Sequence, residues 1–167
     1  KNFLKEDVIL HFEAIKAVYI YVNGQCVGYS QGSKTAAEFD ITSYLNEGKN
    51  LIALQMYRWT DASYLESQDM LRMSGIERDV YLFTRPKVFI EDYYAKTTLD
   101  DSYKNGEFNG EVTVSNTTMD GVSRAIELEI LDGDHSIFKT TDTISIHGNG
   151  NAVYKTTSIL KNLKSWS

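Results

Sequence analysis

The sequence predicts an all-β protein made of two sandwich domains, and three observations support this prediction. Apolar and polar side chains alternate with a period of two residues along much of the chain, as in strands with one buried face. Asn-Gly and Asp-Gly pairs separate many of these stretches at the spacing of antiparallel hairpins. No window sustains the i, i+3, i+4 pattern of an amphipathic helix beyond about a turn. Helix is therefore expected to be nearly absent.

In the first half, we expect strands at residues 8–12, 18–22, 25–29, 51–57 and 79–84. The strand at 18–22 has apolar cover on both faces and should lie inside a sheet. Asn23-Gly24 predicts a type I′ turn, because both residues tolerate positive φ angles. The polar connection that follows carries Asp40 and Thr42, which are placed to cap a single turn. The only proline, Pro86, marks the expected domain boundary.

The second half predicts a smaller antiparallel sandwich, because strand-like segments alternate with turn signals. Its apolar positions are mostly aliphatic and no convergent polar cluster is visible, so this half is interpreted as a spacer. The expected strands are residues 88–99, 107–116, 123–131, 136–146 and 152–160. The expected turns are Asn105-Gly106, Asp120-Gly121, Asp132-Gly133 and Asn149-Gly150.

Composition limits the possible partners of the chain. Its 167 residues carry a net charge of -6 with a pI near 5.1, which argues against nucleic acid as a partner. No apolar run approaches the roughly 20 residues that span a bilayer, so no membrane association is expected. Cys26 is the single cysteine, which excludes an intrachain disulfide. Composition leaves the compartment unknown.

Residues 58–80 form the segment around which the chain is organised. The alternation stops there, and a long loop carries several charged residues among apolar ones. Those apolar side chains predict an ordered loop that can hold a carboxylate in one place, with Trp59 expected to belong to the core. Acidic residues in such a loop are ordinarily solvated or ion-paired, and a catalytic pair among Asp61, Glu66 and Asp69 is the less favoured reading.

The run RWTDASYLESQDMLRMSGIERDVYL resembles the signature of glycoside hydrolase family 2, in its large bacterial β-galactosidase branch. The similarity continues upstream through LHFEAIKAVYIYVNGQCVGYSQGSKTAAEFDITSYLNEGKNLIALQMYRW, and NLKSWS resembles the family's approach to a final strand. The resemblance implies a jelly-roll, galactose-binding-like β-sandwich at residues 1–86, incomplete at its N-terminal end. It implies an immunoglobulin-like β-sandwich at residues 87–167, incomplete at its C-terminal end. The resulting unpaired strand edges are expected to promote association.

The resemblance also implies a function. The chain would be the non-catalytic N-terminal part of a retaining β-galactosidase that hydrolyses terminal non-reducing β-D-galactose residues. Such enzymes need two carboxylates about 5 to 5.5 Å apart, and the family carries them on a barrel domain expected after Ser167. We therefore assign no catalytic residue here and expect the chain to be inactive alone, although it would supply one wall of the active site.

Asp69 is the residue for which the resemblance implies a specific role. The family's DQDM motif stands here as SQDM, residues 67–70, and its second aspartate reaches the active site to contact a sodium ion and a galactosyl hydroxyl. Asp69 is thus the candidate for both substrate binding and sodium binding, while the acid expected at Ser67 is lost. From the residues alone, an ion pair between Asp69 and Arg72 or Arg78 remains the alternative.

Two departures from the family pattern bear on specificity. Leu71 stands where tryptophan is common, so an aromatic surface beside the sugar is lost and substrate preference is open. Glu77 stands where the family has phenylalanine. Because an unpaired charge is costly to bury, Glu77 is predicted to be exposed.

The resemblance implies sodium and magnesium as cofactors of the parent enzyme, with no tight binding by this chain alone. It implies a β-galactoside substrate, a barrel domain of the same chain and a homo-oligomer as partners, in the cytoplasm or periplasm of a bacterium. Two alternatives remain: a free-standing carbohydrate-binding module, and a purely structural or oligomerisation domain of another family 2 glycosidase.

Overall fold

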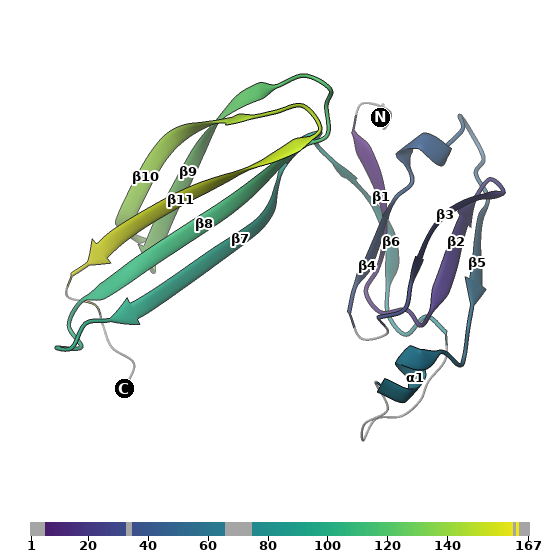
Figure 1. The fold of residues 1–167 in the computed structure, drawn as a ribbon, viewed down its shortest axis with the longest axis horizontal. Helices are drawn as coiled ribbons and strands as arrows, with labels where there is room; N and C mark the ends of the chain where they lie inside the picture. Colours follow the sequence, from purple (N-terminus) through teal and green to yellow (C-terminus); the bar gives the residue numbers. More distant parts are fainter. Residues whose placement is uncertain (1–5, 33–34, 66–74, 162, 164–167) are drawn as a thin grey trace. The chain divides into compact units, whose positions relative to one another are not determined.

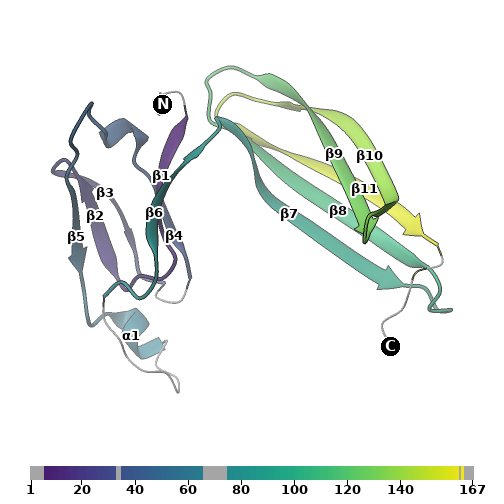
Figure 2. The ribbon, with the colours of Figure 1, turned by 180° about the vertical axis from the view of Figure 1, so that it is seen from behind.

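The computed structural model describes residues 6–32, 35–65, 75–161 and 163. These residues form strands with very little helix, which confirms the all-β prediction (Figures 1 and 2). The chain divides into two compact units, residues 1–86 and 87–167. Each unit has a hydrophobic core of its own.

The first unit is a sandwich of two three-stranded antiparallel sheets, with strand orders β4-β1-β6 and β3-β2-β5 (Figure 1). Its strands are β1 (Asp7–Phe12), β2 (Val18–Val22), β3 (Gln25–Ser30), β4 (Ala37–Asp40), β5 (Ile52–Met56) and β6 (Val80–Arg85). Among the described residues, two short helical turns interrupt these strands, η2 (Thr42–Tyr44) and α1 (Asp61–Leu65).

The β2–β3 hairpin forms where the sequence predicts it. Asn23 has φ 51° and Gly24 has φ 84°, so both residues adopt the left-handed conformation that the tight turn requires. The Asn23 side chain also donates from Nδ2 to the Tyr44 carbonyl at 2.8 Å. This contact ties the hairpin tip to η2. Strand β2 is central in its sheet, as predicted.

The core of the first unit lies between its two sheets. Alternate residues of β2 point inward and are fully buried, while the tyrosines between them face the other way. The buried cluster consists of Val8, Leu10, Phe12, Ile15, Val18, Ile20, Val22, Ala37 and Ile41. Burial of this apolar surface is the main stabilising contribution to the unit.

Two elements in this half were only partly predicted. Strand β4 lies inside the stretch expected to be a polar connection, and it pairs with β1 from Ile9↔Asp40 to Phe12↔Ala37. Alternation in its short, charged sequence is weak, so pairing with β1 decides its conformation. The single turn forms as η2, but its N-cap residue is Ile41, which makes no side-chain capping bond. Asp40, one residue earlier, accepts a hydrogen bond at Oδ1 from the Thr42 amide at 2.9 Å.

The second unit packs a three-stranded sheet, β11-β8-β7, against the two-stranded sheet β10-β9 (Figure 2). Its strands are β7 (Val88–Leu99), β8 (Gly106–Asn116), β9 (Val122–Asp132), β10 (His135–Ile146) and β11 (Gly150–Leu160). They lie within a residue or two of the predicted ones. The buried core consists of Val112, Val114, Ile126, Ile146 and Tyr154.

The β7–β8 turn differs from the Asn-Gly turn that was expected. Gly106 is already in β8, and the positive φ of 58° falls on Tyr103. The Asp100 carboxylate organises the turn instead, because it accepts hydrogen bonds from the Ser102 hydroxyl, the Lys104 amide and the Asn105 amide groups. Aspartate side chains often accept hydrogen bonds from the backbone of their own turn. A prediction based on the Asn-Gly dipeptide alone does not take such bonds into account.

Two connections meet at the opposite end of this unit. Asn116 is only 2% exposed. Its Nδ2 donates to the carbonyls of Asp120 and His147 at 2.8 and 3.1 Å. Gly148 passes so close to the Met119 backbone that any side chain at this position would overlap it. The two connections are therefore locked together by side-chain hydrogen bonds and steric fit.

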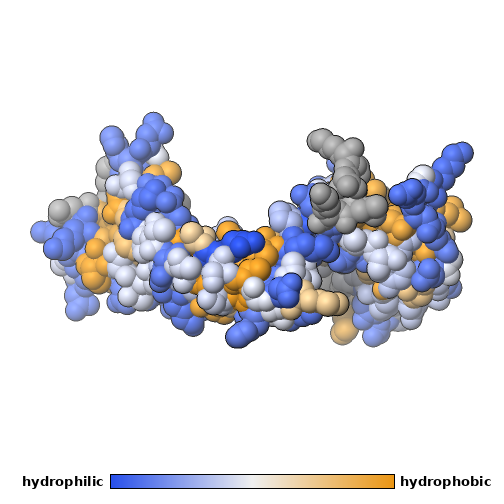
Figure 3. Space-filling model, turned by 90° about the horizontal axis from the view of Figure 1, so that it is seen from above, coloured by the Kyte–Doolittle hydropathy of each residue, from blue (hydrophilic) through white to orange (hydrophobic). Residues whose placement is uncertain are grey.

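The face shown in Figure 3 carries hydrophobic patches among hydrophilic side chains in both units. Within the described residues, no helix is long and apolar enough to cross a membrane.

Replacement of Ile20 by alanine tests the core of the first unit. Ile20 is 0% exposed, so its truncation should lower the free energy of unfolding by about 2–5 kcal/mol. Ile52 on neighbouring β5 is 38% exposed, and Ile52→Ala is the matched control with an expected loss well below about 2 kcal/mol. Urea unfolding measures both, and equal losses would contradict the burial pattern.

Replacement of Asp100 by asparagine tests the β7–β8 turn through its pH dependence. Hydrogen bonds from Ser102 and Asn105 lower the pKa of Asp100 from 3.8 to about 2. The folded state thus binds the proton less tightly than the unfolded state, so this stabilisation is present above pH ~4 and disappears as pH falls toward about 2. The wild type should be more stable than Asp100→Asn at pH 5, and the difference should shrink at pH 2.5. A difference in urea midpoint that stays constant with pH would argue against this origin.

Candidate functional site

The base of the central loop is held by one short segment, residues 13–17, which connects β1 to β2. On the outgoing side, the Tyr57 amide donates to the Ala17 carbonyl at 2.8 Å. On the returning side, Ile15 and Ile76 form an isolated antiparallel bridge. Ile15 is 0% exposed and belongs to the core. Both ends of the loop are therefore fixed to a segment that is itself anchored in the sandwich.

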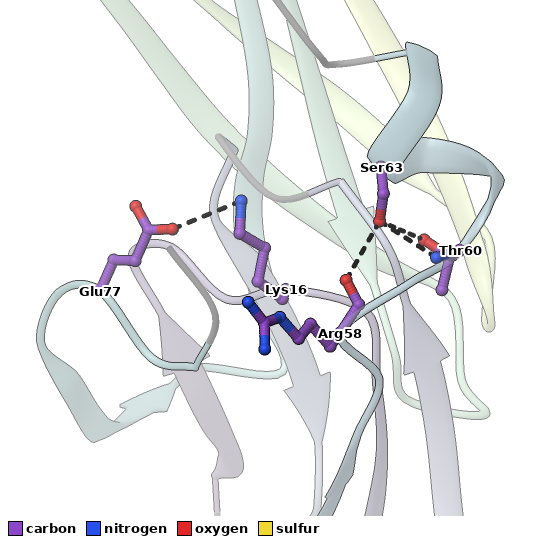
Figure 4. Close-up of polar contacts among 5 residues, drawn as sticks. All are labelled: Lys16, Arg58, Thr60, Ser63 and Glu77. Carbon is purple, nitrogen blue, oxygen red and sulfur yellow. Dashed lines mark hydrogen bonds and ion pairs between the residues drawn. The ribbon is translucent and has the colours of Figure 1, made fainter. Parts of the chain in front are cut away.

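The outgoing end forms a compact turn before α1 (Figure 4). The Ser63 hydroxyl accepts a hydrogen bond from the Thr60 amide at 3.0 Å and donates to the Arg58 carbonyl at 3.3 Å. The Ser63 amide in turn donates to the Thr60 carbonyl at 3.0 Å. Serine and threonine compete well for local backbone groups, which explains why a helical turn begins here. This short helix was not predicted.

The returning end is bound by three backbone hydrogen bonds. The Lys16 amide donates to the Gly75 carbonyl at 3.4 Å, and the Glu77 amide donates to the Ala14 carbonyl at 3.2 Å. The Glu13 amide donates to the Asp79 carbonyl at 3.1 Å. Gly75 has φ 111°, a conformation that side-chain-bearing residues rarely adopt. Glycine therefore permits the bend at which the loop returns to the sandwich.

Glu77 corrects a prediction, because it is not exposed. Its side chain is 16% exposed, and its Oε1 lies 3.4 Å from Nζ of Lys16, whose side chain is 19% exposed (Figure 4). Lys16 places a positive charge beside the carboxylate, which offsets part of the cost of burying it. Glu77 was predicted to be exposed as a lone charge, because the sequence alone does not show that folding brings Lys16 beside it.

Asp69, the candidate ligand for substrate and sodium, lies outside the described residues, as do Glu66, Ser67, Leu71 and Arg72. Of the three loop acids considered as a possible pair, Asp61 alone is described. Its Oδ1 accepts a hydrogen bond from the Ala62 amide at 3.0 Å, and the residue is exposed. Asp61 thus helps to begin α1.

Among the described loop residues, most of the large apolar side chains are exposed, although they were predicted to order the loop by burial. Trp59, predicted to be core, is 57% exposed and lies against the Arg58 guanidinium, whose carbon is 5.3 Å from the ring centre. Tyr64, Leu65 and Ile76 are exposed as well. The backbone hydrogen bonds to residues 13–17 hold the described ends of the loop.

Three tyrosines beside this base form an exposed group that sequence reasoning missed. Tyr19 lies 4.6 Å from Tyr29 and 6.1 Å from Tyr57, measured between ring centres. Partial burial raises the pKa of Tyr29, and the nearby Asp61 carboxylate raises it further. The phenol therefore stays neutral at physiological pH. The alternation of valine, isoleucine and tyrosine in β2 is the signal that could have identified this surface.

The described residues contain no group of three or more His, Cys, Asp or Glu side chains that could hold a metal ion.

The sequences of the two units identify the class of the protein. Each unit matches a model of a glycoside-cleaving enzyme family: residues 1–86 match "Glycosyl hydrolases family 2, sugar binding domain", and residues 88–167 match "Glycosyl hydrolases family 2". The chain belongs to glycosyl hydrolase family 2.

Curated relatives are named beta-galactosidases. The Priestia megaterium enzyme is 50% identical over 112 residues, which are 66% of this chain and 11% of that protein. The Vibrio cholerae enzyme is 44% identical over 119 residues, which are 71% of this chain and 12% of that protein. The chain thus corresponds to a small part of the length of these relatives.

Solved structures share the fold at low sequence identity. A Bacteroides uniformis beta-glucuronidase matches with a TM-score of 0.84 and 19% identity, covering 100% of this chain and 21% of its own. A putative beta-galactosidase from Bacteroides fragilis matches with a TM-score of 0.78 and 20% identity, covering 97% of this chain and 26% of its own. The two-unit fold therefore occurs in proteins with different named activities.

Replacement of Ser63 by alanine tests the turn at the outgoing end. The change removes the acceptor for the Thr60 amide, so hydrogen exchange at that amide should accelerate about fivefold or more, equivalent to roughly 1 kcal/mol of local stability. Amide exchange measured by NMR resolves this effect. The Ile20 amide in central β2 serves as the internal control, and faster exchange there as well would indicate general destabilisation.

Proposed function

We propose that this chain is the non-catalytic N-terminal part of a retaining β-galactosidase, which hydrolyses terminal non-reducing β-D-galactose residues. The observation that carries the proposal is the 50% identity over 112 residues to a beta-galactosidase. Structural likeness alone would not distinguish this activity, since a beta-glucuronidase shares the fold. Sequence identity at this level favours the galactosidase branch.

In this proposal, Asp69 acts from the central loop on the active site. A carboxylate can accept a hydrogen bond from a sugar hydroxyl, and its oxygen atoms suit a hard cation such as sodium. Such a role requires that the loop start and end at fixed points. The hydrogen bonds from residues 13–17 to both described ends supply that restraint.

The remaining parts of the site would come from the parent enzyme. One carboxylate cannot complete a sodium site, so further ligands, the catalytic carboxylates and the magnesium ligands are assigned to a barrel domain. Bound sodium would supply a positive charge beside the galactosyl hydroxyl, and Asp69 would orient both. The parent is proposed to be a bacterial homo-oligomer, in the cytoplasm or periplasm.

The exposed apolar side chains at the loop base support attachment to such a domain. Trp59, Tyr64 and Leu65 are 57%, 76% and 81% exposed within one short stretch. Large apolar side chains gathered in this way are typical of surfaces that another domain covers. We propose that the barrel covers them, which makes the loop base one wall of the active site.

Replacement of Asp69 by asparagine in the full-length enzyme tests the proposal. The amide keeps the shape but loses the charge, so kcat/KM for a nitrophenyl β-galactoside should fall about 10- to 150-fold, the equivalent of one hydrogen bond to a charged group. The sodium concentration that gives half-maximal activity should rise as well. Steady-state kinetics at graded sodium, with potassium maintaining ionic strength, provide the measurement.

Asp61→Asn is the matched control, because Asp61 belongs to the same loop and its described bond is to the adjacent Ala62 amide. This variant should keep kcat/KM within about twofold. If Asp69→Asn also keeps kcat/KM within about twofold, the proposed contact with substrate is wrong and the chain has only a structural role in the enzyme.

A free-standing carbohydrate-binding module is the second candidate, and the exposed tyrosines favour it. The rings of Tyr19, Tyr29 and Tyr57 offer apolar surface of the kind on which sugars stack. Calorimetric titration of the isolated chain with galactose and lactose separates the two functions. A dissociation constant below about 1 mM would favour the module, and weaker binding favours the enzyme part.

A further inference from the structure

We propose that Asn149 is a site of spontaneous deamidation, and that its conversion to isoaspartate loosens the connection between β10 and β11. This modification site lies in the second unit, outside the loop at residues 58–80. The inference is independent of the proposed function, because it rests on the chemistry of the polypeptide and on contacts within the second unit.

An asparagine that precedes a glycine can react without an enzyme. The backbone nitrogen of the glycine loses its proton and attacks the side-chain carbon Cγ of the asparagine, and the amide nitrogen leaves as ammonia. The product is a succinimide ring. Water then opens the ring at one of its two carbonyl groups, which gives either aspartate or isoaspartate. Glycine favours the attack because it has no side chain to obstruct it and its backbone rotates freely.

The chain contains four Asn-Gly pairs, so the structure itself offers a comparison. The four asparagines are Asn23, Asn105, Asn109 and Asn149. The first three are half-buried, whereas Asn149 is exposed. Ring closure requires the asparagine side chain and the neighbouring backbone to rotate toward each other, and packing around a residue opposes this rotation. Exposure therefore favours reaction at Asn149.

Hydrogen bonds hold the amide groups of Asn23 and Asn105. Asn23 donates from Nδ2 to the Tyr44 carbonyl at 2.8 Å, and its Oδ1 accepts a hydrogen bond from the Leu51 amide at 3.0 Å. Asn105 donates from Nδ2 to Oδ2 of Asp100 at 2.7 Å. These bonds have to open before Cγ can turn toward the following backbone nitrogen, so both residues are protected.

Asn109 is protected by its place in the sheet. It lies within β8, where its backbone is paired with β7 on one side and with β11 on the other. Its Nδ2 also donates to Oε1 of Glu107 at 3.3 Å. Rotation of this residue would break the pairing of a central strand.

Asn149 has neither kind of protection for its side chain. That side chain makes no hydrogen bond to any other residue that the structure describes. Its φ angle of 49° is left-handed, a conformation that is unfavourable for a residue with a side chain. Less stability is therefore lost when the residue rotates out of it. Gly150, which supplies the attacking nitrogen, is the first residue of β11.

The surroundings of Asn149 leave little room for isoaspartate. The Asn149 amide donates to the Thr118 carbonyl at 2.7 Å, and Gly148 lies directly against the Met119 backbone. Isoaspartate adds one carbon atom to the main chain and a negative charge to the residue. A longer main chain cannot preserve both contacts, so the connection at residues 147–149 should separate from the one at residues 117–121.

The test is incubation of the 167-residue protein at pH 8, followed by peptide mapping with mass spectrometry. Asn149 should convert at least about fivefold faster than the other three asparagines, the ratio expected where one hydrogen bond of ordinary strength has to open first. The rate should rise with pH, because the attacking nitrogen must lose its proton. The same protein unfolded in urea is the control, and there the four rates should approach one another.

Gly150→Ala is the matched variant, because it retains Asn149 and obstructs only the attack. A Cβ atom at position 150 would lie 3.4 Å from the His147 carbonyl oxygen, an ordinary contact that the fold can accept. Conversion of Asn149 should slow several-fold in this variant, while the rates at Asn23 and Asn105 stay constant. An unchanged rate at Asn149 would show that another reaction produces the change in mass.

The loosening is tested separately with the converted protein. The isoaspartate fraction, isolated by anion exchange, should unfold at lower urea when the second core is followed by NMR. Asn149→Asp adds the charge without the extra main-chain atom and should keep the wild-type midpoint. A wild-type midpoint for the isoaspartate fraction would refute the loosening. Conversion of folded Asn149 no faster than that of Asn23 would refute the site itself.

Discussion

The antiparallel hydrogen bonding between residues 13–17 and the two ends of the central loop is the constraint on which the candidate site depends. Ile15 is fully buried in the first core, so the segment that carries these bonds cannot shift without disturbing the sandwich. The Tyr57 amide bonds to this segment where the loop leaves, and the bridge to Ile76 closes it where the loop returns. Because the segment is anchored in the core, it gives the long loop two fixed attachment points, and a rigid scaffold can carry a functional loop in this way.

Much of the fold could be predicted because its signals are local. The period-two alternation in β2 and the left-handed turn at Asn23 and Gly24 depend on neighbouring residues, and the structure confirms both. Strand β4 was missed because it is short and takes its conformation from pairing with β1. The β7–β8 turn was misplaced because the Asp100 carboxylate, and not the Asn-Gly dipeptide, organises it.

The candidate site was harder to predict, because its geometry depends on contacts between distant positions. The motif gave the family, which the family models and relatives bear out. It could not show that Lys16 would stand beside Glu77, since these residues are far apart in the sequence and meet only through the Ile15–Ile76 bridge. Trp59 was expected to be core because tryptophan usually is, yet its environment here is the Arg58 guanidinium and solvent. The position of Asp69 lies outside the described residues, so its role stays a prediction.

The buried amide of Asn116 has a consequence for producing the protein. Asn116-Thr117-Thr118 is an acceptor sequence for N-linked glycans. However, Asn116 is only 2% exposed, and the side-chain nitrogen that would carry the sugar already donates to the carbonyls of Asp120 and His147. An oligosaccharide attached during secretion from a eukaryotic host would have to be expelled from the interior of the sandwich. Yeast or mammalian secretion would therefore yield misfolded second units wherever the sequon is occupied, whereas bacterial expression or an Asn-sparing Thr118→Ala change avoids the modification altogether.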